Sequence, residues 1–213
     1  MTEMRTEEEQ IEAIKNWWKE NGMQTIAAVV IVAGGWFGYQ GWQSQKQDAG
    51  EGASAVYQQV LELSGSEQEQ DLAQRGLLLD QLKTDFSSTV YASYAALFKA
   101  KDAVNAGNLE EAVTELEFAK QNATTEELSH LATIRLARVK IAQQAYDEAL
   151  SLLAVETMGA FEGQYLEVKG DALKAKGEVD AARDAYSQAV AANQRDGANN
   201  PIVEMKLDDL AVN

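Results

Sequence analysis

Hydrophobic and polar positions follow two different patterns along this chain. Between Asn21 and Gln45 no Asp, Glu, Lys or Arg occurs, and residues 23–39 are almost continuously apolar. About 20 such residues, each rising about 1.5 Å in an α-helix, cross the roughly 30 Å hydrocarbon core of a bilayer. The pattern therefore predicts a transmembrane helix over residues 23–42. A buried core helix is the alternative, although core helices rarely run this long without a charge.

Aromatic residues flank the apolar stretch. Trp17 and Trp18 precede it, and Trp36, Tyr39 and Trp42 stand near its far end. Tryptophan and tyrosine are enriched at membrane–water interfaces, where their rings anchor a spanning helix. A cleaved signal peptide would have a shorter apolar stretch with small residues before the cleavage site. An uncleaved membrane anchor is therefore the preferred interpretation.

Basic residues around the stretch predict its orientation. Arg5, Lys15 and Lys19 precede it, whereas only Lys46 follows closely, the next base being Arg75. Lys and Arg near a span favour the cytoplasmic side of the membrane. We therefore expect a cytoplasmic tail over residues 1–22 and a domain over residues 43–213 on the other side, in a bacterial periplasm or a similar space.

The tail itself predicts a short amphipathic helix. Thr6 and Glu9 have the spacing of a capping box, and apolar residues follow at helical spacing, at Ile11, Ile14, Trp17 and Trp18. Such a helix would lie on the cytoplasmic face of the membrane. Solvated disorder of the first ten residues is the alternative.

Small residues gather on one side of the predicted span, at Ala27, Gly34, Gly38 and Gly41. Glycines spaced four apart allow two membrane helices to approach closely. We interpret these four residues as a packing face for a partner helix in the membrane. Glycine is common in spans, so an accidental spacing is the alternative.

From Gln47 onward the chain is rich in Ala, Leu, Glu, Gln and Lys, which are strong helix formers. Polar and glycine-containing stretches interrupt this pattern and predict turns. Helix-start signals of the capping-box type occur at Ser66 with Glu69, Asn108 with Glu111, and Thr124 with Glu127. Alternation with period two is nearly absent, so strands are not expected. The predicted class is all-α.

Three stretches of this region resemble one another, at about residues 91–120, 128–156 and 163–192. Each contains two predicted helices joined by a turn, with alanine at the same place in the second helix, at Ala112, Ala149 and Ala182. These alanines are 37 and 33 residues apart, close to the period of about 34 residues of tetratricopeptide repeats. Small residues also occur where the paired helices should cross, at Ala100, Ala137 and Gly170. The sequence therefore predicts a tetratricopeptide-like α-solenoid.

A solenoid of this kind needs helices that cover its two ends. Residues 49–63 and 67–83 are expected to form an atypical helical pair at one end. Residues 201–211 are expected to form a capping helix at the other, with Pro201 in its first turn. The prolines that usually separate such repeats are missing and one spacing is too long. A generic helical bundle is therefore the alternative.

Composition and charge narrow the chemistry of the chain. It carries 34 acidic and 18 basic residues, a net charge of −16, no cysteine and one histidine. Most of the acidic excess follows residue 22, where 15 bases face 28 acids. So acidic a chain is not expected to bind nucleic acid, which requires dense Lys and Arg surfaces. The absence of cysteine excludes disulfides and thiolate metal sites, and one histidine leaves little room for a zinc site or a triad.

The remaining candidates for catalysis have simpler explanations. His130 is expected to be a surface or packing residue at the start of a helix. The acid pairs at 110–111, 126–127 and 208–209 are adjacent, so their carboxylates point in different directions on a helix. We expect no catalytic residue, no metal, no cofactor and no small-molecule substrate, and the chain is not predicted to be an enzyme.

Four segments, in this order along the chain, resemble the YfgM family: residues 10–22, 136–139, 170–177 and 205–210. That family consists of single-span bacterial inner-membrane proteins with a periplasmic tetratricopeptide-like domain. The resemblance implies an ancillary subunit of the SecYEG translocon that associates with the membrane-anchored chaperone PpiD. It also implies a role in passing unfolded secreted proteins to periplasmic chaperones, and it supplies no catalytic residues. For some members it implies a part in envelope stress signalling.

Helical-pair repeats form an extended concave surface that is lined by the first helix of each pair. The repeat phase places ten side chains there: Tyr94, Leu97, Lys101, Val104, Ile134, Arg138, Ile141, Glu167, Asp171 and Lys174. We predict that this mixed apolar and charged strip docks protein partners. The alternative is that several of these residues pack against the helices of residues 49–83.

Two other functions stay open at this point. In one, the span alone binds the partner through its glycine face and the soluble domain is a structural tether. In the other, the chain is a non-catalytic envelope scaffold or stress-signalling tether unrelated to secretion.

Overall fold

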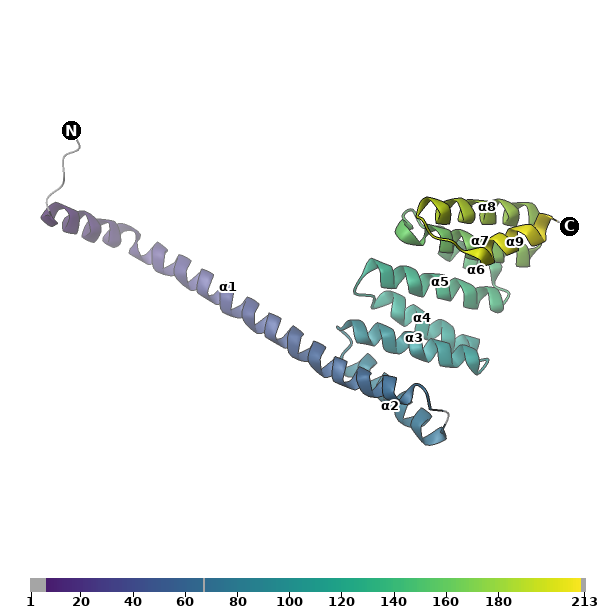
Figure 1. The fold of residues 1–213 in the computed structure, drawn as a ribbon. Helices are drawn as coiled ribbons and strands as arrows, with labels where there is room; N and C mark the ends of the chain where they lie inside the picture. Colours follow the sequence, from purple (N-terminus) through teal and green to yellow (C-terminus); the bar gives the residue numbers. More distant parts are fainter. Residues whose placement is uncertain (1–6, 67, 212–213) are drawn as a thin grey trace. The chain divides into compact units, whose positions relative to one another are not determined.

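The computed structural model describes residues 7–66 and 68–211 (Figure 1). Its helices are α1 (Glu7–Leu63), α2 (Glu69–Asp85), α3 (Val90–Asn105), α4 (Leu109–Gln121), α5 (Glu126–Ala142), α6 (Tyr146–Leu153), the short 3₁₀ helix η1 (Gly159–Phe161), α7 (Glu162–Lys176), α8 (Val179–Arg195) and α9 (Pro201–Ala211). These described residues contain no strand, which confirms the all-α class. Arg5, one of the bases that predict the orientation, and Thr6, the first residue of the predicted N-terminal capping box, lie outside the described residues.

The chain divides into two compact units, Met1–Ala49 and Gly50–Asn213. Helix α1 runs through the first unit and its last turns belong to the second. The structure thus joins into one helix three segments that the sequence predicts separately: the amphipathic helix of the tail, the span and the helix over 49–63. No proline occurs before Pro201, and an isolated glycine costs a helix only about 1 kcal/mol relative to alanine. No residue of this stretch therefore has to end the helix.

The apolar part of α1 exposes large hydrophobic side chains all round. Ile31 is 73% exposed and Phe37 is 72% exposed. Within the described residues, α1 is the one helix long and apolar enough to cross a membrane, and almost none of its apolar window is buried by protein. The polar Thr25 near its start donates its hydroxyl to the carbonyl of Asn21 at 2.9 Å. A helix that is apolar on every side and satisfies its polar groups internally suits a lipid environment.

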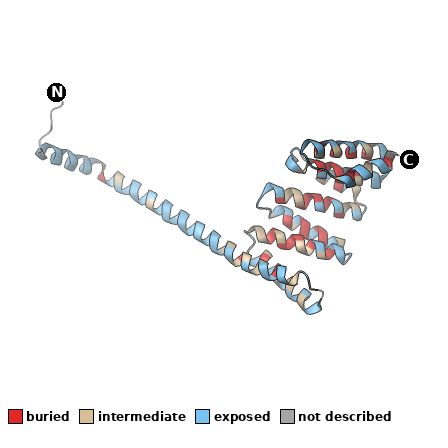
Figure 2. Cartoon of the chain, in the orientation of Figure 1, coloured by how far each residue is buried: buried red, intermediate tan, exposed pale blue. Residues whose placement is uncertain are grey.

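The second unit stacks helical pairs, α3 with α4, α5 with α6, and α7 with α8 (Figure 1). Consecutive helices pack against each other along the stack, with α2 against α3 at one end and α9 against α8 at the other. Figure 2 shows the buried residues gathered where these helices face one another. The three pairs occupy nearly the same stretches as the three repeats seen in the sequence.

The turn inside each pair follows the same backbone path. A residue just after the first helix has positive φ: 75° at Gly107, 63° at Gln144 and 90° at Gly177. The next amide then donates to a carbonyl five residues back, from Asn108 to Ala103, Ala145 to Lys140, and Glu178 to Leu173, at 2.8–2.9 Å. This is the Schellman pattern, which satisfies a free carbonyl at the helix end. Gln144 is the one described non-glycine residue that has positive φ.

Small residues lie at the helix crossings. Ala112, Ala149 and Ala182 are fully buried, and Ala100, Ala137 and Gly170 are buried as well. Two helices can approach closely only where side chains are small, which explains why alanine or glycine recurs at these positions.

Of the three capping boxes predicted after Gln47, one is formed by the predicted residues. The side chain of Asn108 accepts the amide of Glu111 at 3.3 Å. Helix α5 is instead capped by Thr125, whose extended backbone lets its hydroxyl accept the amide of Leu128 at 3.3 Å. Ser66 does not cap α2, because its hydroxyl bonds to Asp71 at 2.5 Å and α2 begins only at Glu69.

Candidate partner-binding groove

The structure distributes the ten predicted concave-face residues over different environments. Four of them, from α3 and α5, line one cavity: Leu97, Lys101, Val104 and Arg138. Tyr94 lines an adjoining cavity. The remaining five lie outside both cavities: Ile134, Ile141, Glu167, Asp171 and Lys174.

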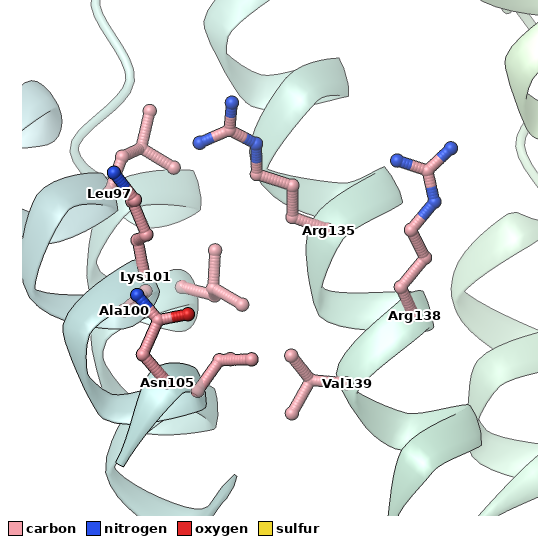
Figure 3. Close-up of a pocket in the computed structure, with 9 residues that line it drawn as sticks. Leu97, Ala100, Lys101, Asn105, Arg135, Arg138 and Val139 are labelled. Atoms are coloured by element: carbon pink, nitrogen blue, oxygen red, sulfur yellow. The ribbon is translucent and has the colours of Figure 1, made fainter. Parts of the chain in front are cut away.

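The first cavity has a volume of about 310 Å³ and lies between α3, α4 and α5. Its apolar walls are formed by Leu97, Ala100, Val104, Leu116 and Val139. Polar side chains complete the lining, namely Lys101, Asn105, Arg135 and Arg138. Figure 3 shows the labelled residues of α3 opposite Arg135 and Val139 of α5, with Arg138 farther from α3. Lys101, Val104, Arg135 and Arg138 are exposed, so the cavity is accessible from solvent.

The second cavity, of about 350 Å³, shares Leu97, Lys101 and Arg135 with the first. Its other lining residues are Tyr57, Tyr94, Phe98 and Leu131. Because the two cavities have lining residues in common, they adjoin one another, and we call the two together the α3–α5 groove. Tyr57 comes from the last turns of α1, within the second unit.

Aromatic rings gather at this second cavity. The ring centroid of Tyr57 lies 5.8 Å from that of Tyr94, 6.2 Å from that of Phe98 and 5.3 Å from that of Tyr91. These separations are typical of favourable aromatic pairs. Burial, with the neighbouring Tyr94 and Tyr91, raises the pKa of the Tyr57 hydroxyl. The group stays neutral at physiological pH and keeps a hydrogen-bond donor at the rim of the groove.

Positive charge is concentrated at the first cavity, which Lys101, Arg135 and Arg138 line, and two of these, Lys101 and Arg135, also line the second. Among the described residues, no carboxylate lies within 4.0 Å of Lys101, Arg135 or Arg138. Partial desolvation and then the neighbouring Arg138 guanidinium lower the pKa of Arg135. Two guanidinium groups thus stand close together with mutual repulsion and without a neutralising partner in the described fold.

The two isoleucines of α5 belong to the core. Ile134 is fully buried with Ala149, Tyr165 and Val168, and Ile141 packs against the same cluster. Helix α5 has neighbours on both sides in the stack, so it buries more than one stripe of its surface. Ile134 is therefore not available to a partner, contrary to the sequence-based expectation.

On α7 the expected concave residues hold the C-terminal helix. Lys206 of α9 lies 2.8 Å from the buried Glu167 and 2.8 Å from Asp171. The hydroxyl of Tyr186 donates to Asp171 at 2.8 Å. Glu167 and Asp171 are thus committed to fixing α9, whereas Lys174 is exposed. The accessible strip is shorter than predicted, because α9 covers its third part.

Several groove residues were not predicted from the sequence. Arg135, Leu116, Asn105 and Val139 line the first cavity, and Tyr57, Phe98 and Leu131 line the second. Arg135 could have been predicted from the sequence, because it lies three residues before Arg138 and therefore on the same side of the helix. Tyr57 could not have been predicted, since its position depends on how the end of α1 packs in the second unit.

The single histidine lies away from the groove. Nδ1 of His130 is 2.9 Å from the hydroxyl of Tyr165, and its ring centroid is 5.4 Å from that of Phe161. The imidazole is half-buried and packed between aromatic rings. This is the packing role that the sequence suggested. In the described part of the chain, no group of three His, Asp or Glu side chains is placed to hold a metal ion.

The four small residues of the span lie on α1, in the first unit. A Cβ built at Gly34, Gly38 or Gly41 would meet no atom within 4 Å, and Ala27 is exposed. At 3.6 residues per turn the four positions fall on one side of the helix. This side has room for the close approach of another helix.

Comparison with known proteins identifies the family. A tetratricopeptide repeat-like domain model matches residues 15–212. The ancillary SecYEG translocon subunit of Haemophilus influenzae is 31% identical over 96% of this chain and 97% of its own length. The proteins of the same name in Neisseria gonorrhoeae and Escherichia coli are 26% and 27% identical, over 96% and 97% of this chain.

The matches run through both the apolar helix and the stacked helical pairs, so they concern the whole arrangement and not one motif. They also agree with the repeat spacing and the turn geometry of the second unit. The chain belongs to the YfgM family of ancillary SecYEG translocon subunits, which has a tetratricopeptide repeat-like domain.

Proposed function

We propose that the chain is a membrane-anchored, non-catalytic ancillary subunit of the Sec translocon, and that it docks protein partners in the α3–α5 groove. The observation that carries this proposal is the groove, which is accessible and combines apolar walls with three cationic side chains. Surfaces of this kind bind proteins, because burial of apolar area supplies affinity and charge supplies selectivity. The names of the relatives support the translocon as the assembly concerned.

In this proposal, α1 anchors the chain in the bacterial inner membrane. Residues 1–22 lie in the cytoplasm and residues 43–213 in the periplasm, as the bases before the span favour. The partners are unfolded secreted proteins that leave the channel and a PpiD-like chaperone that receives them. The absence of cysteine from the chain is compatible with an oxidising periplasm.

Affinity purification from mild detergent tests the proposal. We expect translocon subunits and a PpiD-like chaperone to co-purify with the wild-type chain. A variant with Lys101→Gln, Val104→Asn and Arg138→Gln should lose the chaperone or the secreted proteins, because it removes charge and apolar area from exposed groove positions. Leu97 and Ile141 are left intact, since both contribute to packing.

A matched control carries Lys120→Gln, Val179→Asn and Lys169→Gln, which are exposed positions outside the groove. Val104 and Val179 are 42% and 40% exposed, so the control removes a similar apolar side chain. Equal capture by both variants would remove the groove from the proposal. If no translocon subunit co-purifies with the wild-type chain, a role as an envelope scaffold unrelated to secretion would explain the protein better.

The glycine face of α1 offers a second way to bind, and a separate pair of variants tests it. Gly34→Leu with Gly38→Leu fills the small-residue side of α1, whereas Val32→Leu with Trp36→Leu alters the opposite side. If only the glycine variant loses the complex, the span is the binding element and the second unit is a tether. We expect both to retain the chaperone, which the groove holds.

Orientation can be measured directly, because the native chain has no cysteine. One cysteine is introduced at Glu12 in the tail or at Lys120 in the second unit. A membrane-impermeant maleimide applied to spheroplasts should label only the cysteine at position 120. Labelling at position 12 alone would reverse the proposed topology.

A further inference from the structure

The arginines of the second unit fall into two classes. Five occur in residues 50–213. Three are neutralised within the described fold: Arg75 lies 2.7 Å from Asp102, Arg183 lies 2.7 Å from Asp180, and Arg195 lies 2.5 Å from Glu162. The other two, Arg135 and Arg138, face the groove with no carboxylate of the described residues within 4.0 Å.

This difference is notable in so acidic a unit. Carboxylates outnumber basic groups by nearly two to one after residue 22, so most cations find a partner at little cost. Two adjacent guanidinium groups that have no carboxylate partner repel each other, and an anion that binds between them relieves the repulsion. Because the described fold supplies no such anion, we expect a ligand to supply it.

The surroundings of the charges define the anion further. Lys101 and Arg135 line both cavities, so they stand at the junction of the aromatic cavity and the aliphatic one. The aromatic side is lined by Tyr57, Tyr94 and Phe98, and the aliphatic side includes Val104 and Val139. A ligand that fills the whole groove therefore presents negative charge in the middle and apolar groups on both sides.

We propose that the α3–α5 groove binds a peptide segment of a partner protein in which Asp or Glu is flanked on both sides by apolar side chains. This inference rests on the proposed function, since it names the chemistry of the partner that docks there. The apolar side chains enter the two cavities, and the carboxylate lies between Lys101, Arg135 and Arg138. Guanidinium groups suit this role because their planar fork of N–H donors matches a carboxylate.

Charge complementarity decides between this occupant and the others. Nucleic acid and anionic lipid present extended negative surfaces, which the net negative charge of the second unit would repel. A single acidic side chain within an apolar segment fits a short basic centre between two apolar cavities. A second copy of the chain would bring its own net negative charge and would repel the first. The experiment below distinguishes such a dimer from a bound peptide.

Selection from a displayed library of random peptides tests the proposal on the full chain in nanodiscs of zwitterionic lipid. We expect the selected peptides to carry Asp or Glu with apolar residues on both sides. Replacing that Glu by Gln in a selected peptide should weaken its binding about fivefold, measured by fluorescence anisotropy. The Arg135→Gln, Arg138→Gln double variant should bind the original peptide about tenfold more weakly as well.

The Lys120→Gln, Lys169→Gln double variant is the control, because it removes the same charge from exposed positions outside the groove. It should bind the original peptide as the wild-type chain does. The proposal is overturned if no peptide is enriched over empty nanodiscs, if the enriched peptides lack acids, or if the Gln peptide binds equally well. A concentration-dependent dimer that the arginine double variant abolishes would identify a second copy as the occupant, and would overturn it too.

Failure here is distinguishable from failure of the proposed function. Loss of translocon co-purification with normal selection of acidic peptides would reject the assembly and keep the peptide chemistry. Normal co-purification with no preference for acidic peptides would keep the translocon assembly and reject the peptide chemistry.

Discussion

The ring of Tyr186 in α8 occupies the place that a side chain at Gly170 in α7 would need. A Cβ at position 170 would lie within 2.5 Å of Cδ1 of this ring. Both residues are buried, and α7 and α8 form the third helical pair. The equivalent crossings of the first two pairs hold Ala100 and Ala137. The third pair therefore accommodates a large ring only because its partner position is glycine.

Gly170→Ala should destabilise the second unit. Helix propensity alone would favour alanine by about 1 kcal/mol, but the forced movement of a buried tyrosine costs about 1–3 kcal/mol. We expect a lower thermal midpoint for the full chain in detergent, followed by far-UV circular dichroism. Gly76→Ala is the control, because a Cβ at position 76 would meet no atom within 4 Å. This substitution should therefore stabilise the chain. Equal effects at both positions would refute the packing argument.

Gln144→Gly should stabilise the chain. Gln144 has a φ of 63°, a conformation that costs a residue with a Cβ about 1–2 kcal/mol. Glycine avoids this cost but loses more entropy on folding, which leaves a net gain of about 0.5–1 kcal/mol. Chemical denaturation measures the gain. Gly177→Ala, at a φ of 90°, should change stability in the opposite direction. A Gln144→Gly chain no more stable than wild type would argue against strain at this turn.

Lys206→Met should loosen α9 from α7. The substitution leaves the buried Glu167 and the half-buried Asp171 without their cation, which we expect to cost about 2 kcal/mol. Hydrogen exchange should then rise in α9 before it rises in α3 to α6. Lys176→Met breaks only exposed pairs, with Asp147 and Glu178, and should cost much less. Unchanged exchange in α9 would show that apolar contacts, such as those of Val203, hold this helix without the ion pairs.

The second unit should lose stability in alkali. Burial, and then the hydrogen bond and charge of Asp171, raise the pKa of the Tyr186 hydroxyl. Burial lowers the pKa of Lys206, but Asp171 and Glu167 outweigh it and raise the value overall. A group whose pKa is raised by folding contributes its full stability below its unfolded pKa and loses it as pH rises further. For both groups the loss begins near pH 10.

Tyr186→Phe removes one of these two ionisable groups. At neutral pH it should cost about 1 kcal/mol, the contribution of a typical hydrogen bond, here to Asp171. Above about pH 10 its stability should fall less steeply than that of the wild-type chain. Denaturant midpoints measured between neutral and strongly alkaline pH give both numbers. Parallel profiles for the two chains would exclude Tyr186 as a source of the alkaline loss.

Much of this protein could be predicted from local properties of the sequence. The uncharged stretch between Asn21 and Gln45 predicted an apolar helix, because only lipid or a large core tolerates such a run. Glycine-containing stretches predicted turns, and Gly107 and Gly177 follow the ends of two helices there, because glycine adopts positive φ at low cost. The spacing of the alanines at 112, 149 and 182 predicted the repeat, and the small residues at 100, 137 and 170 predicted the crossings. Each of these signals depends on the type of a residue or on its spacing along the chain, so it can be recognised without the fold.

Only the tertiary structure decided which side chains face a partner. Glu167 and Asp171 looked accessible in the repeat phase, yet Lys206, far along the chain, neutralises them through α9. Ile134 faces the core because α5 has neighbours on both sides, while Arg135 beside it faces the groove. Periodicity indicates that a helix has a buried face. It does not indicate how many neighbours that helix has, because those neighbours come from distant parts of the sequence and are brought together only by packing.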